Sequence, residues 1–356
     1  MEKIPFNQII IRLTIFVSLV GLIVLGKSMT NLSHSSALIG FGGDTMIGRG
    51  VDEIISQRGY SYPWGNLLST LKKPDLTIIN LENTFTTSTK AVPKVFNFKA
   101  SPDRIKTLQL AGIDTVNIAN NHILDFGKQG LEETINTLND ANISHVGAGM
   151  NLKDARRPIT FTKNGIVIGI IGYTDNEPGW AATKDKPGIN YLRVGDIEKV
   201  RKDIASLRSI ADIVIVSIHW GPNMQEKPTQ KFIDFAHQMI DAGVDIIHGH
   251  SAHNFQGIEI YKNKLIMYDS GDLVDDYRVD PVLRNDWSFF YMVTVNKKGI
   301  QEIKLIPTII SDYQVNVAVG NTYKEIIDRI KMLSAPFGTA VSSNGLITIQ
   351  KGEDNA

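Results

Sequence analysis

The chain has 356 residues, of which 37 are basic and 37 acidic, so its formal net charge is zero. This balance leaves no basic footprint for nucleic acid, which we therefore exclude as a partner. The absence of cysteine excludes disulfides, thiolate zinc sites and cysteine nucleophiles, and 42% hydrophobic with 21% charged residues is typical of a globular protein.

The N-terminus carries a basic start followed by an apolar run. Lys3 and Arg12 precede residues 13–26, "LTIFVSLVGLIVLG", and a small polar spacer follows. This order is typical of a secretory signal, although the run is short for a bilayer span of about 20 residues. We expect residues 1–36 to contain an N-terminal hydrophobic helix that acts as a single-pass anchor in the cell membrane. A cleaved signal, which would leave a secreted protein, and a buried core helix are the alternatives. An anchor or a signal would place the following domain outside the cytoplasm.

Short apolar runs alternate with amphipathic segments from residue 37 to about residue 250. The apolar runs predict buried strands. The amphipathic segments predict helices, one of them with an N-cap serine and a glycine stop. The predicted strands are 37–43, 75–81, 113–119, 164–173, 212–220 and 244–249, and the predicted helices are 101–112, 130–141, 196–211 and 229–243.

Antiparallel hairpins replace this alternation toward the C-terminus. The elements predicted there are two strands around Lys262-Asn263 (257–269), a hairpin that turns at "NKKG" (288–310), a helix (323–333) and a short strand (345–350). Together the elements predict an α/β fold of mixed α+β character, with helices outside the sheets. We expect one domain over residues 37–350, followed by a frayed tail at 351–356.

Side chains with metal-ligand chemistry begin where several predicted strands stop. They are Asp44, Glu82, Asn121 with His122, His219, and the histidines of "HGHSAH", His248, His250 and His253. Because ligands collect outside the carboxyl ends of strands in open α/β sheets, we expect these groups to meet. Carboxylates, an amide oxygen and imidazoles suit Mn, Fe or Zn. The set therefore predicts a hydrolytic site with one or two divalent ions.

The order of these motifs resembles a known family. "GD", "NLENTF", "NNHILDFG", "HWG", "GHSAH" and "YDSGDLVDDY" occur in this order over roughly residues 37–310. They are similar to the motifs of the capsule-synthesis CapA family, the poly-γ-glutamate biosynthesis proteins, whose fold is related to the calcineurin-like metallophosphoesterases. The resemblance implies a metallophosphatase-like four-layer α/β/β/α sandwich with metal ions at the strand ends.

The resemblance also implies a role for each ligand candidate. The first metal would be held by Asp44 and His253, the bridging position would go to Glu82, and the second metal would be held by Asn121, His219 and His250. His122 would protonate the leaving group, with Asp125 orienting its imidazole. Substrate contacts are expected from Arg49, whose charge suits an anion, and from Asp272, although the acidic loop 268–277 could equally be solvated.

Two motifs depart from the superfamily pattern. The metallophosphoesterases carry D-x-H in the first motif, whereas this chain has Asp44-Thr45-Met46. The last motif, "HSAH", is one residue longer than the H-x-H of the superfamily. A site with a single metal ion is therefore an alternative to a dinuclear one.

Each candidate also has a structural interpretation. Asp44 could be the N-cap of the segment that follows it, and Asn121-His122 could be turn residues. The remaining candidates could be hydrogen-bonded polar groups at strand ends or in loops. Structural roles are expected for His145, His237 and His248, and positions in the cleft wall for Trp180 and Trp220.

Two functions follow from these observations. The first is a membrane-tethered metal-dependent hydrolase outside the cytoplasm, acting on an anionic polymer such as poly-γ-glutamate or on a phosphoester. The second is a non-enzymatic binding or scaffold component of a polymer synthesis or export complex, in contact with other capsule-synthesis proteins. A nucleotidase-like phosphatase is less favoured, because no pocket for adenine is recognisable in the sequence.

Overall fold

The computed structural model describes residues 35–349. The predicted anchor or signal at residues 13–26 and the predicted tail at 351–356 lie outside this range. From Ala37 on, the described residues form one compact unit. Within residues 35–349, no helix combines the length and the apolar character that a bilayer span requires.

One large sheet is built around the first strand. Within the described range it has nine strands, in the order β18-β17-β16-β1-β2-β5-β6, with β15 beside β1 and β19 beside β17. The strands are β1 (Ala37–Thr45), β2 (Leu76–Leu81), β5 (Thr115–Asn117), β6 (Ser144–Val146), β15 (Asp272–Val274), β16 (Trp287–Asn296), β17 (Gly299–Ser311), β18 (Gln314–Val317) and β19 (Leu346–Ile347). Strands β1, β2, β5 and β6 are parallel to one another. On the other side of β1, the pairs β1–β16, β16–β17 and β17–β18 are antiparallel.

The second large sheet has the order β13-β14-β12-β11-β9-β8. Its strands are β8 (Ile159–Lys163), β9 (Ile166–Thr174), β11 (Ile213–His219), β12 (Ile246–His250), β13 (Ile258–Tyr261) and β14 (Lys264–Met267). Two small ribbons pair β3 (Thr84–Phe85) with β4 (Lys99–Ala100), and β7 (Ala148–Gly149) with β10 (Gly188–Ile189).

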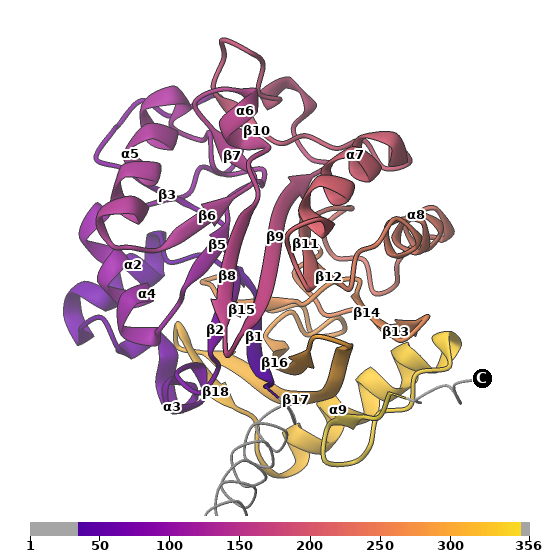
Figure 1. Cartoon of the computed structure of the whole chain (residues 1–356). Coiled ribbons are helices and arrows are strands. Elements are labelled where there is room, and N and C mark those ends of the chain that lie inside the picture. The colour runs from indigo at the N-terminus through magenta and orange to yellow at the C-terminus, as the bar shows by residue number, and fades with distance from the viewer. Residues whose placement is uncertain (1–34, 350–356) are drawn as a thin grey trace, which may run out of the picture. The chain divides into compact units, whose positions relative to one another are not determined.

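The two large sheets face each other, with helices on their outer sides (Figure 1). Apolar side chains of both sheets form one buried cluster, which includes Phe41 and Ile78 from the first sheet and Ile170 and Ile215 from the second. Separate clusters join each outer face to its helices. The first sheet is covered by α2 (Arg49–Arg58), α3 (Leu68–Leu71), α4 (Ile105–Ala111) and α5 (Gly127–Asp140), and the second by α7 (Ile197–Arg208) and α8 (Gln230–Asp241).

Two further helices lie at the margins of these layers. The short helix α6 (Leu152–Ala155) packs beside β7 and β10. Helix α9 (Gly320–Ser334) places Ile326 and Ile330 in the cluster between the sheets.

The mixed α/β class predicted from the sequence is confirmed, and so are both hairpins. Strands β13 and β14 turn at Lys262 and Asn263, whose φ angles of 50° and 61° are those of a type I′ turn. The second hairpin pairs Asn296 with Gly299 around the two lysines of "NKKG". Strand β8 was not predicted, because its residues alternate between half-buried and exposed and contain no continuous apolar run.

Candidate metal centre

The strand registers bring the predicted ligands together at one edge of the two sheets. His219, the last residue of β11, pairs with His250, the last residue of β12. Asp44, near the end of β1, pairs with Asn80 of β2 and with Asp272 of β15. Polar side chains from both sheets therefore meet where the strands end.

A glycine beside Asp44 allows β1 and β15 to approach closely. The Asp44 amide donates a hydrogen bond of 2.9 Å to the carbonyl of Gly271. A Cβ atom on Gly43 would lie 1.8 Å from the same carbonyl oxygen. Since no side chain fits in that space, Gly43 is needed for the register that places Asp44 opposite Asp272.

A first group of donors consists of Asp44, His219 and His250, all buried. The Nδ1 atoms of the two histidines are 3.0 Å apart, and they lie 3.6 and 3.5 Å from Oδ1 of Asp44. Donors bound about 2.0–2.2 Å from a tetrahedral ion lie roughly 3.4 Å from one another. The spacing of this group therefore suits a metal ion.

A second group consists of Asp44, Glu82, His253 and Asp272, again buried. Nδ1 of His253 lies 3.4 Å from Oδ2 of Asp44, 3.9 Å from Oε2 of Glu82 and 3.0 Å from Oδ1 of Asp272. Asp44 thus directs one carboxylate oxygen to each group. Asp44 is the carboxylate common to both groups, and Glu82, for which the bridging position was predicted, also lies near the first group, with Oε1 3.8 Å from Nε2 of His219.

The protonation of these carboxylates reflects their crowding. Burial, and then the charge of Asp44, raise the pKa of Glu82 well above its usual value. Burial and the neighbouring Asp275 do the same to the pKa of Asp272. The carboxyl of Asp44 differs, because the hydrogen bond and charge of His219 outweigh burial and lower its pKa.

Several donor atoms at the site also lack hydrogen-bond partners. Within residues 35–349, Oε1 of Glu82, Oδ2 of Asp272 and Oδ1 of Asn121 are buried and accept no hydrogen bond. Buried polar atoms are normally satisfied, and a buried carboxylate is costly without a counter-charge. The donor set therefore fits a divalent cation, which would supply that charge.

A shell of amides lies beneath the ligands. The side-chain Nδ2 of Asn80 donates to Oδ1 of Asp44 at 2.7 Å. Its side-chain Oδ1 accepts from Nδ2 of Asn117 and of Asn120, at 3.4 and 3.2 Å. Asn80 and Asn117 lie inside strands and were not predicted as site residues. The signal that could have revealed them is an amide in an otherwise apolar buried strand.

His248 belongs to neither donor group. Its Nε2 lies 3.0 Å from the carbonyl of Gly42, and its Nδ1 lies 3.1 Å from the hydroxyl of Ser217. The same hydroxyl is 3.2 Å from Nε2 of His250. His248 thus helps to hold Ser217, which in turn orients the His250 ring.

His122 and Asp125 form a tight pair beside the second group. Nδ1 of His122 lies 2.6 Å from Asp125, whereas its Nε2 points to Glu82 at 3.9 Å. The Phe98 amide and the Lys94 ammonium both donate to Asp125, and the Phe98 ring stacks on the imidazole at 3.8 Å. Burial lowers the pKa of His122 to about 4 in spite of Asp125, so the ring is neutral near pH 7.

An open cleft of about 670 Å³ lies next to these groups. His122, Asn121 and His253 line it, together with aromatic side chains and the three cations Arg49, Lys94 and Arg278. Arg49 is held by a two-pronged ion pair with Asp276 and lies over the Phe98 ring at 4.9 Å. Arg278 has no ion-pair partner among the residues that the structure describes.

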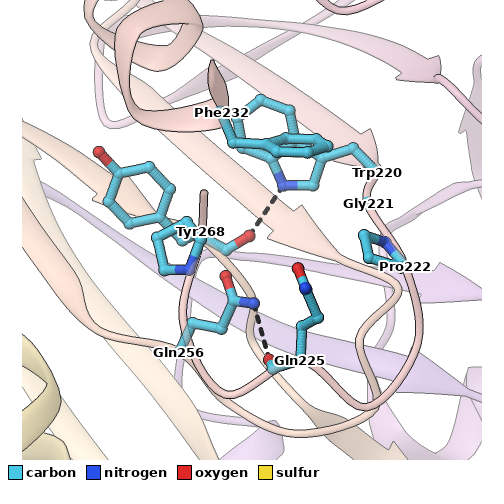
Figure 2. A pocket seen from close by; sticks show the side chains of 8 residues that line it. Trp220, Gly221, Pro222, Gln225, Phe232, Gln256 and Tyr268 are labelled. Atoms are coloured by element: carbon cyan, nitrogen blue, oxygen red, sulfur yellow. Dashed lines mark hydrogen bonds between the residues drawn. The ribbon is translucent and has the colours of Figure 1, made fainter. Parts of the chain in front are cut away.

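The loop that follows β11 is fixed against the second sheet (Figure 2). The Trp220 indole donates to the carbonyl of Tyr268 at 2.8 Å and meets the Phe232 ring edge-on at 5.2 Å. The amide of Gln256 donates to the carbonyl of Gln225 at 2.8 Å. Trp220 therefore lies in the core beside a small cavity and not in the wall of the cleft, where Met224 of the same loop lies instead.

Residues 38–277 match the family model described as "Bacterial capsule synthesis protein PGA_cap". The chain belongs to this family. The matched range of the PGA_cap family contains every predicted metal-binding, catalytic and substrate-binding residue. The predicted relationship to the CapA proteins is thereby confirmed.

Relatives of this PGA_cap protein are similar over most of its length. A probable polyglutamine synthesis accessory protein of Mycobacterium tuberculosis is 31% identical over 84% of this chain and 92% of its own. The PGA biosynthesis protein CapA of Bacillus subtilis is 32% identical, over 74% of this chain and 70% of its own. The capsule biosynthesis protein CapA of Bacillus anthracis is 33% identical, over 66% and 58%.

The structure adds acidic and aromatic residues that sequence reasoning did not select. Tyr277 lines the cleft, meets the His253 ring edge-on at 5.0 Å and donates to Glu82 at 3.4 Å. Burial raises the pKa of Asp269 to about 8 and that of Asp275 to about 6. All three belong to the segment 268–277, which was recognised as acidic but could not be distinguished from a solvated loop.

Proposed function

We propose that this protein is a metal-dependent hydrolase of capsule or poly-γ-glutamate synthesis. The observation that carries the proposal is the pair of donor groups that share Asp44, next to His122–Asp125 and open to a cationic cleft. The two facing sheets, with helices outside and donors at the strand ends, support a metallophosphatase-like four-layer fold for the domain at residues 37–350. Residues 1–36 would tether this domain to the membrane on its outer side.

The donor groups assign the metal ligands more closely. Asp44, His219 and His250 would hold one ion, and Asp44, Glu82, His253 and Asp272 the other, with Asn121 as a further ligand. Asp272 would replace the histidine that the first motif lacks, since it lies opposite Asp44 in the sheet. Met46 occupies the position of that histidine, but it is fully buried in the core.

A bound divalent ion supplies a polarised substrate oxygen and an activated water. The chain's own residues would do the rest. Asp125 holds Nδ1 of His122, so that Nε2 can take up a proton at the cleft and return it to the leaving group. The stacked Phe98 ring shields the imidazole from water, and Arg49, Lys94 and Arg278 would bind an anionic substrate.

The substrate class follows from the charge of the cleft and from the names of the relatives. Three cations around the opening suit a chain of carboxylates or a phosphoester. The relatives are named for capsule, PGA and polyglutamine synthesis, which favours the polymer. Other capsule-synthesis proteins are the expected partners.

The test is metal analysis and turnover with the full chain, purified in mild detergent. We expect one or two equivalents of Mn, Fe or Zn and cleavage of poly-γ-glutamate or of a generic phosphoester. His250→Ala should lose the ion of its donor group together with turnover, whereas the control His237→Ala, on the outer helix α8, should keep both metal and turnover. If the wild type binds none of these metals and His250→Ala changes nothing, the proposal is wrong.

A scaffold role is the second candidate, and the missing histidine of the first motif favours it. A cell assay separates the two roles. If His250→Ala and Asp44→Asn cells make normal polymer while cells without residues 1–36 make none, binding and tethering are the function. If cells with the site variants no longer make normal polymer while the variant protein stays at normal abundance, the hydrolase is supported.

A further inference from the structure

A second cationic cavity lies apart from the metal centre. It has a volume of about 650 Å³ and is lined by α6 and the residues that flank it, together with Lys184. We call it the distal groove. Its charged side chains are Lys153, Arg156, Arg157, Lys184 and a single acid, Asp154.

The positive charge of the distal groove is only partly compensated. Arg156 is paired with Asp203 of α7, and Arg157 lies 3.9 Å from Asp154. Within residues 35–349, Lys153 and Lys184 have no ion-pair partner, and both are exposed. In a chain of zero net charge, such a local excess attracts anions.

A short segment connects the distal groove with the cleft of the metal centre. Trp180 ends the turn η3 (Pro178–Trp180), and its ring lies 4.9 Å from the ammonium of Lys94, which lines the cleft. Thr183 accepts a hydrogen bond of 2.8 Å from Leu152, which lines the distal groove. Trp180 and Lys184 are four residues apart, so at most about 14 Å of chain separates them.

We propose that the distal groove is a second binding site for a linear polyanion whose reacting unit lies in the cleft. The polymer would leave the cleft past Lys94 and Trp180 and place later carboxylates against Lys153 and Lys184. This inference rests on the proposed function, because it takes the substrate to be the polymer. It adds the requirement that the polymer be long enough to reach both places.

Length is what separates a polymer from a small phosphoester. A phosphoester fills the cleft alone, whereas a chain with one carboxylate per residue can engage both sites. Binding at the second site is then intramolecular, and affinity rises with length without any stronger single contact. The distal groove therefore predicts an affinity that depends on chain length.

The test measures binding of fluorescein-labelled poly-γ-glutamate to the full chain in detergent by anisotropy. Two lengths are compared at low salt, a short oligomer of about 2 residues and a long polymer of about 20 residues. The variant is Lys153→Ala/Lys184→Ala. The control is Lys297→Ala/Lys298→Ala, which removes the same charge from the exposed β16–β17 turn.

We expect the long polymer to bind the groove variant roughly five- to tenfold more weakly than the wild type, as the loss of two exposed charge pairs predicts. The short oligomer should bind both equally, and the control should match the wild type at both lengths. Equal binding of the long polymer to all three proteins would overturn the inference. So would an equal loss in the control, because general charge would then explain the effect.

A membrane surface is the competing occupant of a basic groove. Co-sedimentation with vesicles of anionic and of neutral phospholipid tests it, because residues 1–36 would bind both kinds alike. If the groove variant loses a preference for anionic vesicles but keeps the length-dependent polymer affinity, the distal groove faces lipid and our inference is wrong. Because these measurements are of binding, a protein without hydrolytic activity that still shows the length effect would contradict the proposed hydrolase and leave the distal groove supported.

Discussion

Asp272 is the residue that most changes the view of the first motif. The sequence lacks a histidine two positions after Asp44, and a dinuclear site therefore lacked one ligand. The carboxylate of Asp272 lies 3.0 Å from His253, in the donor group that contains Glu82. In the proposed centre, Asp272 of β15 would therefore replace the ligand that the first motif lacks.

Asp272→Asn should weaken metal binding. The amide keeps the shape of the side chain but removes one negative charge from a group of three carboxylates, so we expect at least about a tenfold loss of metal affinity. Calorimetric titration with Mn or Zn measures it. Asp312→Asn, in an exposed turn, is the control, and equal affinities of the two variants would refute a ligand role for Asp272.

His145 provides a pH-dependent prediction away from the metal centre. Burial, and then Arg157, lower the pKa of His145 to about 4 from 6.5. Between pH 6.5 and pH 4, His145 is therefore protonated in the unfolded chain but neutral in the folded one. Its contribution to stability is fully present above about pH 6.5 and is lost as the pH falls toward 4. The side chain is half-buried, so we expect a loss of about 1–3 kcal/mol.

His145→Gln should remove this dependence. Urea unfolding of both proteins at about pH 7.5 and pH 4.5 gives the measurement. From pH 7.5 to pH 4.5, the wild type should lose about 1–3 kcal/mol more unfolding free energy than the variant does. Acidic groups titrate in both proteins and cancel. A difference that does not change with pH would contradict the lowered pKa.

At the scale of single elements, the approach of β1 to β15 sets the position of Asp44. Gly43→Ala would push its Cβ into the Gly271 carbonyl, which cannot move without breaking the pairing. We expect a loss of about 1–3 kcal/mol in unfolding free energy, together with weaker metal binding. Gly179→Ala, which meets no atom within 4 Å, should leave both unchanged. Equal stability of the two variants would show that the strands can separate freely.

The sequence predicted the strands that have continuous apolar runs and the hairpin that has a distinctive turn. Buried strands such as β9 and β11 have continuous apolar runs, and the turn at Lys262-Asn263 follows from its two residues. Strand β8 escaped because one of its faces is exposed. The donors at strand ends could be found because an apolar run stops before each of them.

The rest of the site depends on pairing between distant segments. Asn80 and Asn117 matter only because Asp44 of β1 lies beside Asn80 in the same sheet and His250 of β12, in the other sheet, lies near Asn117. The sequence alone does not reveal which strands are neighbours. Asp272 was expected only as a substrate contact and Tyr277 was not selected, whereas the structure places both beside His253, Asp272 through the register of β15 with β1. Asp44 could be recognised as a ligand, but not as the carboxylate that both groups share.

At the scale of the whole molecule, the donor groups join the two sheets. Asp44, Glu82 and Asp272 come from or follow strands of the first sheet, and His219 and His250 come from the second. An ion between them would link both layers at the edge where the core is most polar. Binding should therefore contribute to the stability of the entire domain.

Removing the metal should lower the melting temperature. A ligand that binds only the folded state at about 100 times its dissociation constant adds about 2.7 kcal/mol, and chelation should withdraw that amount. Thermal unfolding with and without EDTA, followed by addition of Mn or Zn, measures the effect. His250→Ala, which removes a ligand from one of the two donor groups, should respond less to chelator than the wild type. A wild type that is indifferent to chelator would argue against a resident ion.

The division of Asp44 between two unlike donor groups has a chemical consequence. One group offers two imidazoles and the shared carboxylate, whereas the other offers three carboxylates and one imidazole. Nitrogen-rich positions favour softer ions such as Zn, and oxygen-rich positions favour harder ions such as Mn. The two halves of the centre would therefore sort ions from a mixture by hardness, and a preparation supplied with a single metal would fill them unequally.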